Sequence, residues 1–373
     1  MRIAFVSDAV YPYFKGGKEK RLYEFSTRLA KMGYDVHIYT MKWWEGPKDV
    51  EENGVQLHAI CKHHEMYAGE RRSIPEALIF SVACLKLLTK SFDIVDVDHM
   101  PFFPLYTMWA VCKLKDKKFF ATWNEVWGRK YWVEYMGVKG NVAFLVERMS
   151  VLLPDSIISI SAHTTNRLIQ VMHCKKQIVE VACGLDLKQI QNVKPASSQT
   201  DILYSGRLLK HKRVDLLIKA IAKLKKDGQK VNCLIVGEGP ERKRLESLTD
   251  RLGLQKQIEF HNFYEDHDEV FAMMKAAKVF ALPSEREGFG IVAIEANACG
   301  RPVITNLADG NAAKDLIENG ANGFLFNQTH DALGTVLSDA LREGLNLEMK
   351  CLSFANGFDW GKLTRKLEEV YET

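Results

Sequence analysis

Two glutamates eight residues apart, Glu287 and Glu295, are the residues whose spacing points most directly to chemistry. Glu287 follows a predicted strand, and a predicted helix begins near Phe289. On a helix, eight residues rise about 12 Å and make a little over two turns, so both carboxylates would project to nearly the same side. That separation suits a ligand with two hydroxylated rings joined by a diphosphate. The intervening Gly288 and Gly290 let backbone N–H groups approach a phosphate at the positive end of the helix.

A purely structural interpretation of this segment competes with the functional one. A carboxylate near the start of a helix is an ordinary partner of the helix dipole, and this explains Glu287 alone. Glu295 is harder to explain in that way, because it interrupts an apolar run between Ile294 and Ala296. We therefore favour a binding role for the whole segment.

Two cations, Arg207 and Lys212, follow another predicted strand at 202–205. Ligands bind at the carboxyl ends of parallel strands, and two cations can offset the charge of a departing diphosphate. The neighbouring Lys210 and Arg213 are interpreted as a solvated basic loop. Arg207 and Lys212 are predicted to be functional.

The first half of the chain contains a glycine pair and an acidic tripeptide at strand ends. Gly16 and Gly17 follow the first predicted strand and open the first predicted helix, where backbone N–H groups can face an anion. On its own this loop is equally compatible with an ordinary turn. Asp96-Val97-Asp98 is a weak metal-binding signal, so no metal site is predicted. Asp96 is interpreted as an exposed strand end, while Asp98 and His99 could line an acceptor.

The order of predicted elements indicates an α/β fold with parallel sheets. Short apolar runs alternate with amphipathic helical stretches, and the pattern restarts after a polar stretch at 189–201. We predict an N-terminal Rossmann-like domain at 1–188, onto which a C-terminal helix at 359–373 packs, and a second Rossmann-like domain at 189–358. Such a pair of α/β units predicts an active site in the cleft between them.

Composition restricts the cellular context and the partners. The 373 residues carry a net charge of +4, too small to indicate a nucleic-acid partner. The eight cysteines form no CxxC pair, which favours reduced thiols over disulfides or structural zinc. The N-terminal apolar run is too short for a signal peptide, and no uncharged apolar stretch reaches the ~18 residues of a membrane span. We expect a cytoplasmic protein, at most peripheral on the inner face of a membrane.

Several motifs of the second half together resemble retaining glycosyltransferases of family 4, which have the GT-B fold. The spacing of Glu287 and Glu295 is similar to the E-x7-E element of that family. The other similar segments are Ser205-Gly206-Arg207-Leu208, Lys212-Arg213-Val214-Asp215, Val236-Gly237-Glu238-Gly239-Pro240, Leu282-Pro283-Ser284 and Ala298-Cys299-Gly300-Arg301-Pro302-Val303. The resemblance covers the second half nearly throughout and the first half more loosely.

The resemblance implies a metal-independent transfer from a nucleoside-diphosphate sugar, UDP- or GDP-linked, without a cofactor. It assigns catalysis to Arg207, Lys212 and Glu287, with the two cations on the donor diphosphate. It implies that the remaining matched residues bind the donor: Gly16, Gly17, Gly288, Phe289, Gly290, Ile291 and Glu295.

One departure from the family pattern lies in the stretch 121–128. The family often has a histidine where this chain has Asn124. Asparagine can still form hydrogen bonds but cannot titrate near pH 7. Three explanations stay open: the enzyme functions without the histidine, His99 compensates, or activity is reduced.

The acceptor is the least specified partner. Basic residues at 113–118 precede a dense group of aromatic residues, which suits an acceptor with an apolar tail at a membrane surface. Core packing and the stacking of sugars explain the aromatic residues equally well, so a glycan and a lipid-linked acceptor both stay open. Two alternatives to a transferase are a catalytically silent nucleotide-sugar-binding subunit, supported only by Asn124, and a GT-B sugar-nucleotide epimerase. A phosphorylase would carry a pyridoxal-binding lysine, for which no signature is present.

Overall fold

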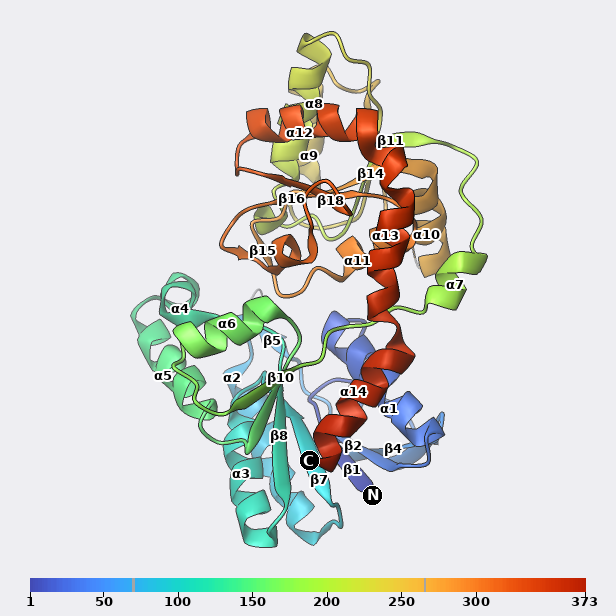
Figure 1. Ribbon diagram of the computed structural model, residues 1–373. Coiled ribbons are helices and arrows are strands. Elements are labelled where there is room, and N and C mark those ends of the chain that lie inside the picture. The colour runs from blue at the N-terminus through green and yellow to red at the C-terminus, as the bar shows by residue number, and fades with distance from the viewer. Residues whose placement is uncertain (69–70, 265) are drawn as a thin grey trace. The chain divides into compact units, whose positions relative to one another are not determined.

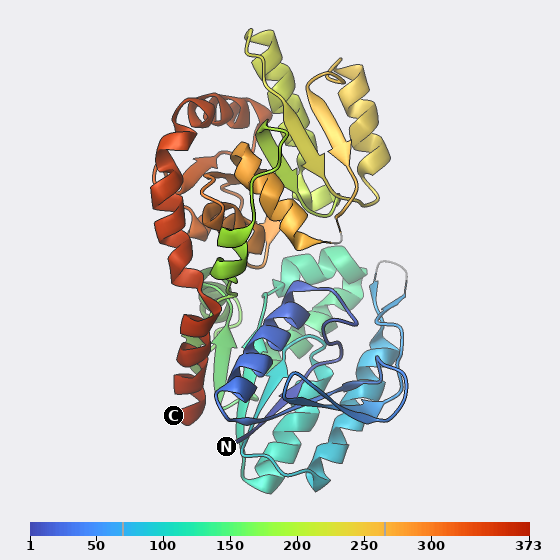
Figure 2. The same ribbon diagram turned by 90° about the vertical axis from the view of Figure 1, so that its right-hand side faces the viewer.

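The computed structural model describes residues 1–68, 71–264 and 266–373 (Figures 1 and 2). The chain divides into two compact units. The first comprises residues 1–183 together with 360–373, and the second comprises residues 184–359. Each unit is built on its own mainly parallel β-sheet.

The first unit has an eight-stranded sheet in the order β10-β9-β8-β7-β1-β2-β4-β3. All neighbours pair in parallel except β3 and β4, which are antiparallel. The strands are β1 (Arg2–Val6), β2 (Asp35–Met41), β3 (Asp49–Glu52), β4 (Val55–Cys61), β7 (Ile94–Asp98), β8 (Lys118–Trp123), β9 (Ser156–Ser159) and β10 (Gln177–Glu180), with β5 (Tyr67–Ala68) and β6 (Arg71–Arg72) forming a separate short pair.

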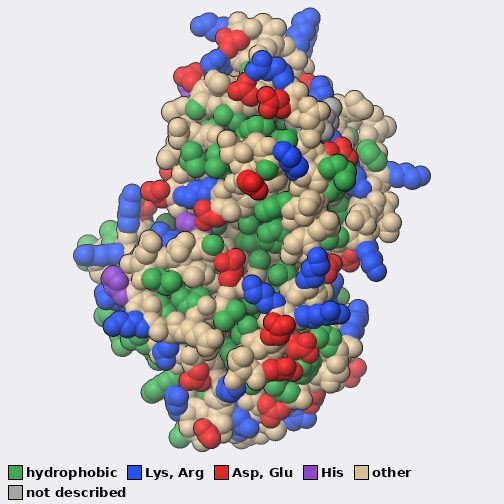
Figure 3. All heavy atoms as spheres, in the orientation of Figure 1, with side chains coloured by type: hydrophobic (Ala, Val, Ile, Leu, Met, Phe, Trp, Pro, Cys, Tyr) green, Lys and Arg blue, Asp and Glu red, His purple; other side chains and the backbone are tan. Residues whose placement is uncertain are grey.

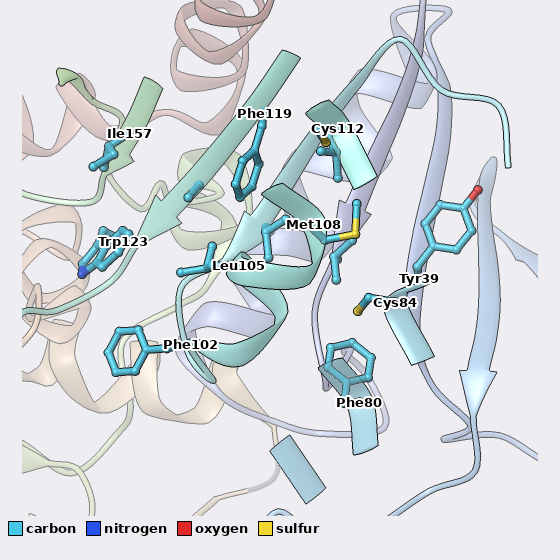
Figure 4. Close-up of a cluster of buried hydrophobic side chains, with 14 of the residues drawn as sticks. Tyr39, Phe80, Cys84, Phe102, Leu105, Met108, Cys112, Phe119, Trp123 and Ile157 are labelled. Carbon is cyan, nitrogen blue, oxygen red and sulfur yellow. The ribbon is translucent and has the colours of Figure 1, made fainter. Parts of the chain in front are cut away.

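Helices connect these strands, and their apolar faces form the core of the first unit. They are α1 (Gly17–Lys31), α2 (Ile74–Ala83), α3 (Phe103–Lys115), α4 (Gly128–Met136), α5 (Gly140–Ser150), α6 (Ala162–Gln170) and α14 (Trp360–Glu372), with the 3-10 helices η1 (Cys84–Thr89) and η2 (Gly137–Lys139). Figure 4 shows Leu105 and Met108 of α3 packed against Phe119 and Trp123 of β8. Strands covered by helices are apolar along most of their length, which explains the short continuous apolar runs in the sequence.

The C-terminal helix α14 belongs to the first unit and packs against α1. The rings of Phe25 and Trp360 meet edge to face at 5.1 Å between centroids. The Tyr371 hydroxyl donates a hydrogen bond to Asp96 Oδ2 at 2.6 Å, and Thr122 Oγ1 donates to the same carboxylate at 2.9 Å. Asp96 is buried, so its interpretation as an exposed strand end is wrong. Its side chain instead fixes the end of the chain to the sheet.

The second unit has a six-stranded, fully parallel sheet in the order β13-β12-β11-β14-β16-β18. Its strands are β11 (Thr200–Ser205), β12 (Cys233–Val236), β13 (Ile258–His261), β14 (Ala277–Leu282), β16 (Val303–Asn306) and β18 (Gly323–Phe326), with β15 (Arg286–Glu287) and β17 (Gly310–Asn311) forming a separate parallel pair. Its helices are α7 (Leu187–Asn192), α8 (Val214–Lys226), α9 (Arg242–Arg251), α10 (His267–Ala276), α11 (Ile291–Ala298), α12 (His330–Glu343) and α13 (Glu348–Ala355), with the 3-10 helices η3 (Lys210–Lys212), η4 (Ala312–Leu316), η5 (Gly344–Leu347) and η6 (Asn356–Phe358).

The polar stretch at 189–201 is partly regular structure. Its first residues complete α7, and its last two belong to β11. Among the helices of the described residues, none combines the length and the apolar character needed to cross a bilayer.

The buried Asp96 carboxyl predicts a specific pH dependence of stability. Burial raises its pKa from 3.8 to about 6. Its stabilising contribution is therefore fully present below pH 3.8 and is lost as the pH rises through about 6, by about 3 kcal/mol in total. Asp96→Asn keeps an acceptor for Tyr371 and removes the titration. Between pH 5 and 8, the melting temperature should therefore fall less steeply with rising pH for this variant than for the wild type.

Asp116→Asn makes the same chemical change at an exposed position and serves as the control. Parallel pH profiles for the wild type and Asp96→Asn would contradict the assignment.

Candidate functional site

The carboxylate of Glu287 does not lie on a helix. Glu287 ends the short strand β15, which pairs in parallel with β17, and α11 begins only at Ile291. The expectation that Glu287 and Glu295 share one helix axis is wrong, so the 12 Å helical separation does not apply. The intervening Gly288-Phe289-Gly290 is a turn because Gly290 adopts a left-handed conformation, with φ of 89°, as the N-cap of α11.

Gly290 is confined by close packing as well as by its backbone angle. A Cβ atom at this position would lie 2.5 Å from the Cβ of Ala313. Ala313 is held in turn by Asn311, whose Oδ1 accepts its backbone N–H at 3.1 Å and whose Nδ2 donates to Thr305 Oγ1 at 3.0 Å. Phe289 is buried with its ring 6.1 Å from that of Phe358, so its side chain packs inside the unit. The backbone of this turn is the part available to a ligand.

Lys212 and Glu287 form an ion pair, with Nζ 2.7 Å from Oε1. Lys212 ends η3, which follows β11, so the pair joins the ends of two different loops. A backbone hydrogen bond of 2.8 Å from Glu285 N to His211 O holds the same loops together. Arg213 pairs with Asp215, at 3.2 Å.

The surroundings of His211 show how positive this region is. The pKa of His211 is lowered to about 4, first by burial and then by the nearby charges of Lys212, Arg286 and Arg207. Glu287 acts in the opposite direction but does not compensate. Three cations therefore act on one neutral imidazole. Sequence reasoning predicted Arg207 and Lys212 but missed both His211 and Arg286.

Two glycines explain how Arg207 is positioned. The ends of β11 and β12 are joined by hydrogen bonds from Gly206 N to Val236 O at 3.0 Å and from Leu208 N to Glu238 O at 2.7 Å. A Cβ on Gly237 would lie 2.0 Å from the Gly206 carbonyl oxygen, and one on Gly239 would lie 2.4 Å from that of Leu208. The two sequence motifs that contain these residues are therefore one structural element.

Glu295 is buried in α11 and pairs with a histidine that sequence reasoning missed. Its Oε1 lies 3.0 Å from Nε2 of His267, the first residue of α10. The side chain of His267 is about half exposed, so a buried carboxylate is linked to a residue at the surface. No periodic or motif signal surrounds His267, because it only begins an ordinary amphipathic helix.

In the first unit, the start of α1 already holds a carboxylate of the protein. Gly16 is the N-cap, and a Cβ there would lie 2.1 Å from Oε2 of Glu19. Burial raises the pKa of Glu19 to about 7. Lys18 Nζ lies 2.8 Å from Asp8 Oδ1 and 3.4 Å from Asp98 Oδ2. Around Gly17, by contrast, the space for a side chain is open.

His99 and Asn124 lie together, at the carboxyl ends of β7 and β8. The backbone N–H of Asn124 donates to His99 Nδ1 at 3.3 Å. Burial, reinforced by Lys18, lowers the pKa of His99 to about 3. This lowered pKa favours the neutral form of the His99 imidazole at physiological pH.

Comparison with known proteins identifies the family to which the chain belongs. Residues 15–189 match the family model Glycosyltransferase Family 4, and residues 187–355 match the model Glycosyl transferases group 1. D-inositol 3-phosphate glycosyltransferase from Nocardia farcinica is 27% identical over 249 residues, which cover 60% of this chain and 54% of that protein. The chain therefore spans about half the length of that relative.

Solved structures share the fold over the whole chain. Sucrose-phosphate synthase from Thermosynechococcus elongatus has a TM-score of 0.81 at 19% identity, covering 100% of this chain and 98% of that one. Anabaena HepE, solved in complex with UDP-glucose, has a TM-score of 0.71 at 17% identity, covering 100% and 99%. Fold and family matches together define a glycosyltransferase of the GT-B class. The chain belongs to glycosyltransferase family 4.

The packing of Gly290 predicts an unusually large cost for adding one methyl group. Gly290→Ala introduces both a left-handed alanine and a steric conflict with Ala313. Gly228 has a similar φ of 82°, but its Cβ position is open, so Gly228→Ala reports the backbone cost alone, about 1 kcal/mol. Gly290→Ala should lower the free energy of unfolding by about 2 kcal/mol more than the control. Equal losses in denaturant unfolding would show that the turn can relax.

Proposed function

We propose that this enzyme transfers a sugar from a UDP- or GDP-linked donor to a glycan or lipid-linked acceptor, with retention of anomeric configuration. The observation that carries the proposal is the ion pair between Lys212 and Glu287. It puts a cation suited to a diphosphate next to a carboxylate suited to sugar hydroxyls. HepE, which shares the fold, was solved with UDP-glucose, and that supports a nucleotide-sugar donor here.

The donor is held by the second unit in this proposal. Glu295, oriented by His267, binds the ribose hydroxyls. Glu287 binds hydroxyls of the transferred sugar, and the backbone N–H groups of the turn 288–291 face the donor. Arg207 and Lys212 neutralise the diphosphate in place of a metal ion. The positive surroundings of His211 support this distribution of roles, because a dianionic leaving group needs cations at the point where its charge develops.

The proposed chemistry is same-face substitution. The bond between the anomeric carbon and the phosphate oxygen breaks, and a bond from that carbon to the acceptor oxygen forms on the same face. The departing phosphate oxygen takes the proton of the acceptor hydroxyl. This route requires no titrating side chain, which is consistent with the neutral His99 and with asparagine at position 124. Gly16 and Gly17, at the start of α1, are also proposed to bind the donor phosphates, which requires the Glu19 carboxylate to move away.

His99 and Asn124 are placed on the acceptor side, and the enzyme is proposed to act in the cytoplasm with peripheral contact to a membrane. A nucleotide-sugar-binding subunit without transfer activity is the second candidate, and Asn124 beside a buried histidine is the observation that favours it. Such a subunit would bind a donor without consuming it in any acceptor extract. An epimerase would instead convert the donor in the absence of an acceptor.

Removing either member of the ion pair should abolish most transfer activity. Glu287→Gln keeps a polar contact to Lys212 without the charge, and Lys212→Ala removes a cation from the leaving group. Each should lower kcat by about 100- to 1,000-fold while thermal unfolding stays cooperative. Lys210→Ala, an exposed lysine of the same 3-10 helix, is the matched control and should retain activity. Turnover at the wild-type rate in both site variants would refute the assigned roles.

Donor identity can be tested by ligand-induced stabilisation. A saturating nucleotide sugar at about 100 times its Kd should stabilise the folded chain by about 2.7 kcal/mol, whereas other nucleotide sugars leave the melting temperature unchanged. Glu295→Gln should weaken the effect of the active donor without lowering the unliganded melting temperature by more than a few degrees. If uridine and guanosine sugars both leave the wild type unshifted, the proposed donor class is wrong.

A further inference from the structure

The first unit contains a cavity of about 590 Å³ that the proposed donor site does not use. Its walls are mostly apolar and aromatic, and they come from β6, α2, α4, η2, α5 and the segment between β7 and the start of α3. The aromatic and sulfur-containing side chains on the walls are Met100, Phe102, Phe103, Trp127, Trp132, Tyr135 and Met136. Small-molecule sites have volumes of about 300–1,000 Å³ with mainly apolar walls, so the cavity has the size of a binding site.

A buried carboxylate keeps the aromatic wall in place. Glu147 is fully buried and accepts hydrogen bonds from Trp127 N at 2.8 Å, from Gly128 N at 3.1 Å and from the indole N–H of Trp132 at 2.7 Å. Three donors on one carboxylate fix the start of α4 and the orientation of an indole ring. Because these hydrogen bonds hold the aromatic wall in one position, we infer that the cavity is preformed.

One end of the cavity adjoins the polar cluster at the strand ends. Met100 and Phe102 on its wall follow β7 directly, and Lys18 Nζ donates to the Met100 carbonyl at 3.3 Å. Arg72, which also lines the cavity, forms an ion pair with Asp8 after β1. The carboxyl ends of parallel strands are where α/β proteins bind ligands. The cavity therefore extends from the expected reaction end of this sheet into an apolar interior.

The mouth of the cavity is apolar and open to solvent. Ile74 and Val142 line it, yet they remain 48% and 66% exposed. Exposed apolar side chains continue from them along α2 and α5 at helical spacing. These are Leu78 and Val82 on α2, and Leu145 and Met149 on α5. In Figure 3, hydrophobic and basic side chains lie next to each other over α4 and α5, on the left edge of this unit.

The charges at the cavity are of one sign. Arg71, Arg72 and Lys139 lie on its lining, with Arg72 paired to Asp8, and no carboxylate lies on the lining among the described residues. A glycan would meet few polar partners on such walls. A second copy of the chain, bound through a twofold contact, would bring the same basic patch against itself. An amphiphile with a long apolar chain and an anionic group fits both features, because its chain can pack against the apolar walls and its anionic group can pair with the basic residues.

We propose that this cavity holds the apolar chain of a phosphate-linked lipid acceptor, with its phosphate at Arg71, Arg72 and Lys139. The exposed stripes of α2 and α5 then contact the surface of the membrane that carries the lipid. The term acceptor rests on the proposed transferase function, whereas occupancy of the cavity by a lipid chain does not. The two can therefore be tested separately.

Binding is measured by the fluorescence of the cavity tryptophans, Trp127 and Trp132, during titration with hexyl, octyl and decyl phosphate below their micelle concentrations. Affinity should increase about fourfold for each added methylene, because each is transferred from water to an apolar site. Inorganic phosphate should produce no change in fluorescence. Ala143→Trp, which fills the cavity, should weaken decyl phosphate binding at least tenfold. Ala110→Trp, on α3 outside the cavity lining, is the matched control.

Each variant is also tested for thermal stabilisation by nucleotide sugars, which confirms that it is folded. Ala143→Leu provides a smaller obstruction if the tryptophan variant does not fold. Affinity independent of chain length, or equal in Ala143→Trp and the wild type, would overturn the proposal. So would saturation of the cavity by soluble oligosaccharides, or a concentration-dependent dimer that blocks alkyl phosphate binding. Absence of any nucleotide-sugar effect would refute the donor assignment and leave the chain-length result standing.

Discussion

Close approach of backbone to backbone at the strand ends is the constraint on which the candidate donor site depends. The carbonyl oxygens of Gly206 and Leu208 occupy the space that side chains at positions 237 and 239 would need. The left-handed turn at Gly290 is pressed against Ala313 in the same way. Loops this close have little conformational freedom, so the cations they carry are positioned before a ligand binds. In many enzymes such preorganised charge makes the largest single contribution to the rate enhancement.

Like charges brought together in this way need compensation, and the two units provide it differently. In the second unit, Glu287 neutralises Lys212, but the region around them stays positive. The lowered pKa of His211 reflects this, because Lys212, Arg286 and Arg207 all disfavour its charged form. In the first unit, Lys18 is surrounded by three carboxylates, those of Asp8, Glu19 and Asp98. An incoming anion is therefore attracted to the second unit, whereas the first unit has to give up a resident carboxylate to bind one.

The sequence predicted the elements of the second unit closely, because propensity and packing agree there. The strand predicted at 202–205 is the last part of β11, which begins two residues earlier at Thr200 and ends at Ser205. The helix expected near Phe289 begins later because Gly290 and the pairing of β15 with β17 override the local helical pattern. His267 and Glu147 act through contacts with residues distant in the chain, and neither lies in a motif. Asp96 likewise appeared exposed because its partner Tyr371 lies 275 residues away.

The two proposed substrates differ in the same way, because one is recognised by residues in motifs and the other by contacts between distant residues. A nucleotide sugar is recognised through backbone groups and a few fixed charges, so its site requires particular residues at particular spacings, and these are visible in a sequence. An apolar chain is recognised through volume and surface. The walls of the cavity come from several elements, and several combinations of aliphatic and aromatic residues would serve equally well. The same aromatic residues that looked like core or sugar-stacking groups in the sequence become a preformed cavity only when Glu147 fixes them. Donor recognition is therefore expected to be readable from a sequence of this kind, whereas acceptor recognition has to be read from the shape of the first unit.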